Sequence, residues 1–459
     1  MMEHTPVPIS ILQLAGPMML ASIAQMIYNM TDTFFIGQTG DPNMVAGISL
    51  SMPLFMVSQG LGNVFAIGAA SYISRMLGAK NTAEARNANA VSFYVTLGIG
   101  IIITVLLMFL QKPILHIIGT SDVTFPYASD YFFIIAIFIS FAMVNIALNG
   151  QIRSEGASVV AMISMLIGII LNIILDPLFI LYFGWGVKGA AWATVIGIVA
   201  SVCYCVFYYA RGHSHLSIHI KYFVPNRKML GEILKIGVPA GISNFAFTLA
   251  AVAGNIIAAG YGDYVVAGSG IFIRITMLCF SLIMSLAMGY MPFAGFNFGA
   301  NNIKRLSAGL KITVLYTTSL AIFFTVIFYF FGKDMMVVFI RDARTIDAGS
   351  KMMRAFLVGM PLLGIQMTIM VTFQALGKPV HATIVNMGRQ FLIYLPLLFL
   401  LNSFFGFTGF IYAQPISDIV TTIVAVLLSI SLFRNFPKQR LFEESENPVP
   451  EVETKEKVS

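Results

Sequence analysis

Charged residues are scarce in this chain of 459 residues, since only 10% are Asp, Glu, Lys or Arg, whereas a soluble protein carries about 25%. Apolar residues make up 58% of the chain and the mean hydropathy is +0.85. The apolar residues form runs long enough to cross a bilayer, which takes roughly 20 residues per helix. This balance excludes a soluble globular enzyme and a disordered protein. It predicts an all-α polytopic membrane protein with little room for an extramembrane domain.

Cysteine is also rare, which argues against a disulfide scaffold or a metal centre. Cys203, Cys205 and Cys279 lie in apolar runs, are odd in number and lack the spacing of metal ligands. We interpret them as small core residues and expect no cofactor. The first ten residues have neither the basic start nor the cleavage site of a signal peptide, so we expect the first span to be retained.

Twelve apolar runs, separated by charged or turn-rich breaks, predict twelve transmembrane helices. The runs are 10–36, 45–74, 88–110, 127–150, 158–182, 187–209, 233–259, 265–292, 310–332, 350–374, 380–402 and 407–433. A cytoplasmic N-terminus places 18 of the 27 Lys and Arg residues inside and seven outside, as the positive-inside rule requires. We therefore expect both termini in the cytoplasm and a plasma (inner) membrane location. The net charge of +7 then faces anionic lipid, and no nucleic-acid partner is expected.

The chain contains an internal repeat. Residues 11–17 read ILQLAGP and residues 233–239 read ILKIGVP, and Gly156 recurs as Gly377 at nearly the same offset. Six spans in each copy predict two parallel six-helix repeats, an N-lobe and a C-lobe, with a V-shaped central cleft and alternating access by rocking. The expected divisions are an N-terminal lobe (1–210), a cytoplasmic linker (211–232), a C-terminal lobe (233–436) and a disordered cytoplasmic tail (437–459).

Carboxylates inside the spans are costly and mark functional candidates. Asp32 and Asp176 are predicted at similar depth near the outer side of the membrane. Asn172 lies one turn from Asp176, Gln25 lies two turns from Asp32, and Thr194 reaches this depth from the next span. Oxygen ligands can bind a small cation such as Na⁺. Two neighbouring carboxylates in low-dielectric surroundings can also bind and release a proton. These residues are therefore compatible with either H⁺ or Na⁺ as the coupling ion.

These polar groups have a purely structural alternative, in which they pair with each other and only fix helix packing. The repeat provides a control, because its offset places Gly254 opposite Asp32 and Leu395 opposite Asp176. The second half therefore lacks both acids although its scaffold is similar. This difference favours a cation-coupling site that belongs to the N-terminal lobe.

The second half carries a different set of polar residues. Arg389 and Asp418 lie within neighbouring spans, where they are placed to form a buried ion pair, and Gln366 lies in a third span. A substrate contact is the alternative role for this set. Pro17, which is equivalent to Pro239, is a candidate hinge in the first helix, and a passive kink is its alternative role.

These features resemble the MATE (multidrug and toxic compound extrusion) transporter family over about residues 8–435. The resemblance rests on the two six-span halves, the Pro17 helix with Gln25 and Asp32, the Asn172–Pro177 stretch, and Thr194 in GAAWATVIG. It implies antiport of small organic cations and drugs in exchange for H⁺ or Na⁺. It also implies that the residues matching Asp32, Asn172, Asp176 and Thr194 form the cation site of the N-terminal lobe. We expect the protein to be monomeric.

One departure from the family pattern concerns the coupling ion. The sodium-coupled branch has acids in spans 7 and 10, whereas this chain has Phe247 and Gln366 near those places. The resemblance is therefore to the branch that couples through the N-terminal lobe, and protons are favoured while sodium remains the alternative.

Two other functions are compatible with parts of the sequence. A lipid-linked oligosaccharide flippase of a related family has a similar repeat, but it needs a strongly basic cavity, and only Arg274 and Arg389 lie within spans. An intramembrane aspartyl protease is suggested by the GxGD pattern at residues 260–263. Asp263, however, falls in a short turn outside the membrane. We therefore expect a transporter rather than an enzyme.

Overall fold

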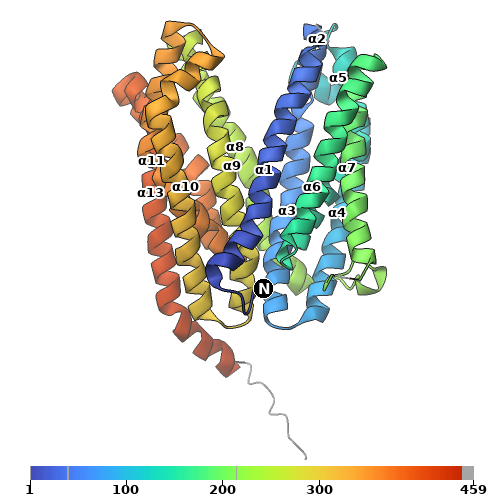
Figure 1. The fold of residues 1–459 in the computed structure, drawn as a ribbon, viewed down its shortest axis with the longest axis vertical. Coiled ribbons are helices and arrows are strands. Elements are labelled where there is room, and N and C mark those ends of the chain that lie inside the picture. Colours follow the sequence, from blue (N-terminus) through green and yellow to red (C-terminus); the bar gives the residue numbers. More distant parts are fainter. Residues whose placement is uncertain (1, 39–40, 213, 447–459) are drawn as a thin grey trace, which may run out of the picture.

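The computed structural model describes residues 2–38, 41–212 and 214–446, apart from the side chains of residues 32, 33, 52 and 435–446. All regular secondary structure in this part of the chain is helical. The helices form two groups that meet near the N-terminus and diverge toward the opposite end, so that the ribbon has the outline of a V (Figure 1).

The first group contains the helices of the N-terminal half. They are α1 (Val7–Gly37), α2 (Pro42–Leu50), α3 (Met52–Gly78), α4 (Thr82–Ile118), α5 (Phe125–Ser154), α6 (Ser158–Pro177), the π-helical turn η1 (Leu178–Tyr182) and α7 (Gly186–Ala210).

The second group contains the helices of the C-terminal half, and a short 3₁₀ turn, η2 (Ile220–Tyr222), lies in the connection between the groups. The helices are α8 (Arg227–Tyr261), α9 (Asp263–Gly299), α10 (Ile303–Phe339), α11 (Ala343–Ala375), α12 (Pro379–Met387), the π-helical turn η3 (Gly388–Leu392) and α13 (Tyr394–Glu446).

Eleven helices among the described residues are long and apolar enough to span a membrane. The last of them, Pro379–Arg434, covers two of the predicted spans, because the backbone leaves the helical region at Gly406 (φ 57°, ψ −138°) and turns back there. A side chain at Gly409 would overlap the carbonyl oxygen of Leu401, so the reversal is tight. With this turn, all twelve predicted spans are accounted for.

The internal repeat is visible in the backbone. Lys80 and Asn301 both have φ of 60°, and the turn glycines Gly156 and Gly377 have φ of 92° and 67°. A left-handed residue after a helix is a common stop signal, and glycine adopts it without strain. The same unusual conformations recur at an offset of 221 residues, because 301 minus 80 and 377 minus 156 both give this number. The two halves therefore share one fold, as predicted.

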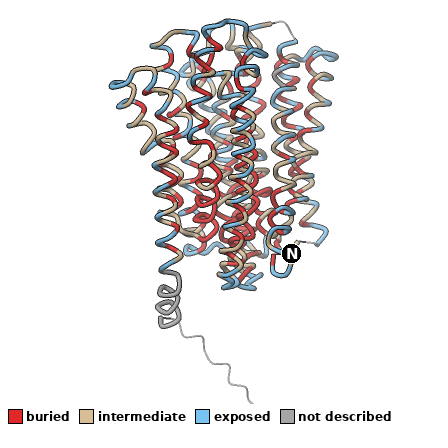
Figure 2. Tube along the Cα trace, turned by 60° about the vertical axis from the view of Figure 1, so that its left-hand side comes forward, coloured by how far each residue is buried: buried red, intermediate tan, exposed pale blue. Residues whose placement is uncertain are grey.

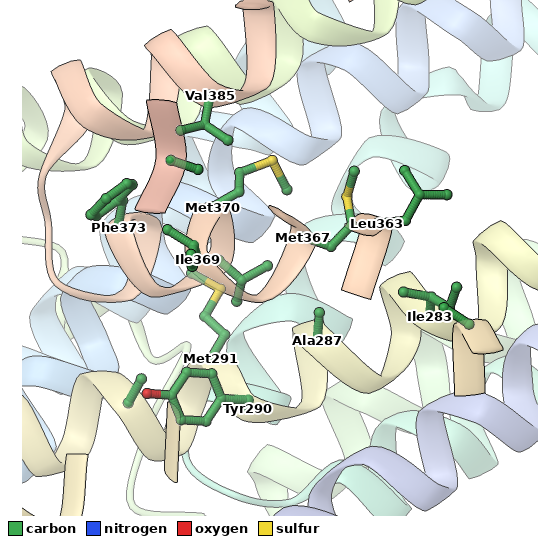
Figure 3. Packing of buried hydrophobic residues seen from close by; sticks show 14 of the residues in the cluster. Ile283, Ala287, Tyr290, Met291, Leu363, Met367, Ile369, Met370, Phe373 and Val385 are labelled. Atoms are coloured by element: carbon green, nitrogen blue, oxygen red, sulfur yellow. The ribbon is translucent and has the colours of Figure 1, made fainter. Parts of the chain in front are cut away.

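The two groups pack together close to the N-terminal side. Helix α3 packs against α8 and α9, and α1 packs against α9. The buried residues are densest in this lower part of the molecule (Figure 2). A large apolar cluster of the second group lies beside this junction, where Tyr290 and Met291 of α9 face Met367 and Phe373 of α11 (Figure 3). The diverging helices are thus anchored at one end only.

Two predicted boundaries differ from the observed helices. The connection between the groups covers residues 211–226, because α8 begins at Arg227 rather than near residue 233. Asn226 caps this start by accepting a hydrogen bond from the Lys228 amide at 2.9 Å. Helix α13 continues to Glu446, into the segment 437–459 that was expected to be disordered, and residues 447–459 lie outside the described part.

Candidate functional site

The N-terminal group holds a buried polar cluster on α6 and α7. Asp176 has no exposed surface, and Asn172 and Thr194 are 2% and 6% exposed. The Asn172 amide donates through its nitrogen to Asp176 Oδ2 at 2.7 Å, and its oxygen accepts from the Thr194 hydroxyl at 3.3 Å and amide at 3.1 Å. Three of the predicted site residues therefore lie together, in the order carboxylate, amide, hydroxyl.

The local backbone explains how Asp176 is presented. Asp176 and Asn172 are four residues apart and share a face of α6, which is turned to α7. Pro177 follows directly and lacks the amide hydrogen of a regular helix. The next turn is widened to a π-helix, with the Phe183 amide donating to the Leu178 carbonyl at 2.9 Å. Such single π turns occur often beside functional residues.

Helix α1 brings the remaining predicted residues to this region. It packs against α6 and against η1, and Asp32 lies five residues before its end at Gly37. The side chain of Asp32 lies outside the described part of the chain, so its distance from Asp176 stays a prediction. Gln25 donates to Asn29 Oδ1 at 3.3 Å on its own helix. Pro17 lies inside α1, which continues through it as one helix.

The composition of the cluster restricts its chemistry. In the described part of the chain, no group of three or more His, Cys, Asp or Glu side chains is placed to hold a metal ion. Asp176 accepts a hydrogen bond from the neutral amide of Asn172, which in turn is bonded to Thr194. A buried carboxylate in such surroundings can accept a proton or a small monovalent cation that neutralises it.

The C-terminal group holds the other polar set. Arg389 Nε donates to Asp418 Oδ1 at 2.8 Å, with side-chain exposures of 9% and 0%. Gln414, one turn before Asp418, donates to the same oxygen at 3.0 Å. Sequence reasoning missed Gln414, although its spacing of four residues from Asp418 on one helix was the available signal. Gln366 is fully buried, and its amide has no hydrogen-bond partner in the described residues.

Two contacts between the groups were not predicted. Arg75 of α3 forms an ion pair with Glu232 of α8 at 3.1 Å. Arg305 of α10 donates to the carbonyl oxygens of Met2, at 2.9 Å, and Thr5. The sequence indicates only that these basic residues face the cytoplasm in the predicted topology, because nothing near them in the sequence points to a distant partner.

The position of Asp263 bears on the protease alternative. Asp263 is the first residue of α9, is exposed, and follows Gly262, whose φ of 120° favours glycine. It lies at the end of the second group that is opposite the N-terminus (Figure 1).

Two repeated helical groups, with the buried Asn172–Asp176–Thr194 cluster in the first and the Arg389–Asp418 ion pair in the second, are typical of a multi-pass membrane transporter. Comparisons with known proteins specify the family. A family model described as MatE matches residues 17–178 and 239–400, and these segments begin at the equivalent residues Pro17 and Pro239. The chain belongs to this family.

Similar proteins and structures support the same assignment. The chain is 31% identical over 412 residues to the multidrug export protein MepA of Staphylococcus saprophyticus, covering 90% of this chain and 91% of that protein. It is also 31% identical over 431 residues to MepA of Staphylococcus aureus, covering 93% and 94%. A solved structure, an outward-facing conformation of a multidrug resistance MATE family transporter, matches with a TM-score of 0.89 at 24% identity, covering 95% of this chain and 98% of that chain.

Proposed function

We propose that this protein is a secondary antiporter that exports organic, mostly cationic drugs in exchange for H⁺ or Na⁺. The observation that carries the proposal is the buried Asn172–Asp176–Thr194 cluster in one lobe of a MATE transporter. Its similarity to proteins named multidrug export protein MepA supports the class of substrate. The protein is proposed to act as a monomer in the plasma membrane, with both termini in the cytoplasm.

Coupling follows from the electrostatics of the cluster. A bare carboxylate is costly to bury in low-dielectric surroundings, and a proton or cation removes that cost. Asn172, which is itself bonded to Thr194, holds the carboxylate of Asp176 in place, and Asp32 is proposed to complete the site from α1. Because α1 packs against both α6 and α9, a change of charge at the site can alter the contact between the lobes. Pro17 is the proposed hinge for this movement.

The energy available is adequate for drug export. One charge that moves across a potential of 100 mV supplies roughly 2.3 kcal/mol, which supports a substrate gradient of about fifty-fold. The absence of acids at Phe247 and Gln366 favours protons as the coupling ion, with sodium as the alternative. The proposed N-terminal lobe, residues 1–210, thus carries the coupling chemistry, and residues 233–436 form its partner lobe.

The test is transport by the purified protein in liposomes. Inward gradients of H⁺ or Na⁺ are imposed separately, and extrusion of the fluorescent cation rhodamine 123 is recorded. One of the two gradients is expected to drive extrusion, and this identifies the coupling ion. Asp176→Asn and Asp32→Asn should each reduce gradient-driven extrusion at least tenfold, because neither variant can release a proton or carry the charge that binds sodium.

The matched control is Asp263→Asn, which removes an exposed carboxylate at the start of α9 and should leave extrusion unchanged. Full extrusion by a well-folded Asp176→Asn protein contradicts coupling at this site. Extrusion that responds to neither gradient contradicts antiport as a whole.

A further inference from the structure

We propose that Arg389 is a specificity-determining residue of the C-terminal lobe, which binds the carboxylate of zwitterionic substrates. This inference rests on the proposed export function and deepens it, because it assigns a residue that recognises the anionic group of drugs that carry one beside a cationic group. It assigns a role to a buried arginine that the coupling mechanism does not use.

The hydrogen bonds of Arg389 leave half of its binding capacity unused. A guanidinium group has two edges that can bind a carboxylate, one with Nε and one formed by the two terminal nitrogens. Asp418 bonds to Nε at 2.8 Å. The two terminal nitrogens make no hydrogen bond within the described residues, although only 9% of the side chain is exposed. Their fork is therefore available for the two oxygens of a ligand carboxylate.

The arginine is held in place by its neighbours, so the fork has a defined direction. Gln414 shares the Asp418 oxygen at 3.0 Å, and the Ser417 hydroxyl donates to the Arg389 carbonyl at 3.0 Å. Arg389 lies in the π turn η3, where the Ile393 amide donates to the Gly388 carbonyl at 2.9 Å. The wider turn changes which way its side chains project compared with a regular helix.

The guanidinium group packs on an aromatic side chain of its own lobe. It lies over the ring of Phe280 in α9, with 5.2 Å from the central carbon to the ring centre. Helix α9 packs against α1 and α3, so it belongs to the layer of the C-terminal lobe that faces the N-terminal lobe. A flat cation beside an aromatic ring is a suitable surface for an aromatic carboxylic acid.

The repeat shows that the scaffold does not need this ion pair. The turn glycines Gly156 and Gly377 set an offset of 221 for the helix of Arg389, which places Gly168 opposite it. Gly186 and Gly406 set an offset of 220 for the helix of Asp418, which places Ile198 opposite it. A side chain at Gly197 would lie 2.6 Å from the Gly168 carbonyl, so in the N-terminal lobe the two helices are in direct backbone contact there. The N-terminal lobe has a glycine and an isoleucine at the two equivalent positions, whereas the C-terminal lobe has an arginine and an acid. The difference indicates a role beyond packing.

Asp418 limits how tightly Arg389 can hold an anion. Its negative charge offsets the guanidinium charge, and so a bound carboxylate experiences a weaker field than at a lone arginine. Loose binding suits an exporter, because a substrate that is bound too tightly is not released. The pair therefore favours acceptance of a carboxylate without trapping it.

The test compares two dyes that differ only in this group. Rhodamine 110 has a free carboxylate and is a zwitterion, whereas rhodamine 123 is its methyl ester and is a cation. Both contain the same positively charged fluorophore and have nearly the same shape. Export by the full chain in liposomes is measured for each dye. Arg389→Lys keeps a charge for Asp418 but loses the fork, and it should reduce rhodamine 110 export about tenfold while rhodamine 123 export changes less than twofold.

A second variant tests whether a loss of export in Arg389→Lys is caused by misfolding. Arg389→Met with Asp418→Leu removes both charges together and replaces them with apolar groups, which buried pairs often tolerate. It should show the same selective loss. The control is Lys351→Gln with Asp347→Asn, an ion pair of the same lobe whose side chains are 55% and 63% exposed. This control should change neither dye.

The outcomes separate the two proposals. If the unmodified protein exports neither dye, the proposed function fails. If it exports rhodamine 123 but both Arg389 variants lose the two dyes equally, Arg389 is structural and the inference is overturned. It is also overturned if rhodamine 110 export is unaffected in folded variants. Selective loss of rhodamine 110 supports it.

Discussion

Arg75 Nη2 donates a hydrogen bond to Glu232 Oε2 at 3.1 Å, and this ion pair joins α3 of one lobe to α8 of the other. Arg75 also donates through Nε to the Ser71 carbonyl at 3.2 Å, which orients its side chain. Gly377, in the turn between α11 and α12, leaves the space that the guanidinium group fills. The arginine therefore links three helices at the end where the lobes meet.

We predict that this ion pair stabilises the state in which the lobes are closed near the N-terminus. Glu232→Gln should increase the population of the separated state about threefold, because a partly exposed pair contributes up to about 1 kcal/mol. Spin labels at positions 80 and 304, one in each lobe, report the separation. The double variant with Arg75→Gln should add little to either single change, whereas fully additive effects contradict a direct interaction.

Two glycines should be essential for closure. A side chain at Gly78 would overlap the Phe296 carbonyl, and one at Gly299 would overlap the Arg75 carbonyl, so α3 and α9 touch through their backbones. Gly78→Ala and Gly299→Ala should each hold the lobes apart and reduce transport at least tenfold, as measured by dye export. Gly98→Ala is the control, since nothing lies within 4 Å of a side chain there. Normal transport by folded Gly78→Ala and Gly299→Ala proteins argues against this contact.

The hydroxyl of Thr194 should contribute to coupling through Asn172. Thr194→Val keeps the shape and removes the hydroxyl group, so the Asn172 oxygen retains only the backbone amide at 3.1 Å. One hydrogen bond contributes about 0.5–1.5 kcal/mol, so the concentration of coupling ion needed for half-maximal export should rise several-fold. Thr194→Ser should restore it. An unchanged ion dependence for Thr194→Val excludes a role for the hydroxyl.

The segment that connects the lobes should dock against Glu155 in a pH-dependent way. Glu155 accepts hydrogen bonds from Tyr208 at 2.9 Å, Ser214 at 2.8 Å and the His215 amide at 3.0 Å. Burial nevertheless raises the pKa of Glu155 above its usual value. The docked state therefore binds a proton more tightly than the undocked state. The docked state is most stable at pH values below the ordinary pKa of a glutamate side chain. Its stability falls as pH rises through the raised pKa of Glu155.

Hydrogen exchange of residues 214–218, corrected for intrinsic rates, measures this docking. Protection should fall as pH rises through the raised pKa of Glu155. Glu155→Gln should remove the trend, because it cannot titrate. His215→Gln should retain it, and loss of the trend in that variant instead assigns the effect to the histidine.

The buried polar residues show how much of the candidate site the sequence alone predicts. Asn172 and Asp176 were placed on one helix face by their spacing, and Thr194 was placed at their depth by counting turns. The structure brings these three together. Gln414 was missed beside Asp418, and the π turn at Arg389 was not predicted, because a widened turn has no strong signature in a single sequence.

The sequence by itself determined the membrane environment, the twelve spans, the duplication and the helix face that Asn172 and Asp176 share. These properties follow from apolar run length, repeat offset and helical periodicity, which are local along the chain. Only the tertiary structure decided which helices are neighbours, and hence that Arg75 meets Glu232 and that Phe280 lies against Arg389. Periodicity specifies the face and height of a residue on its own helix, but the packing of helices selects its partner.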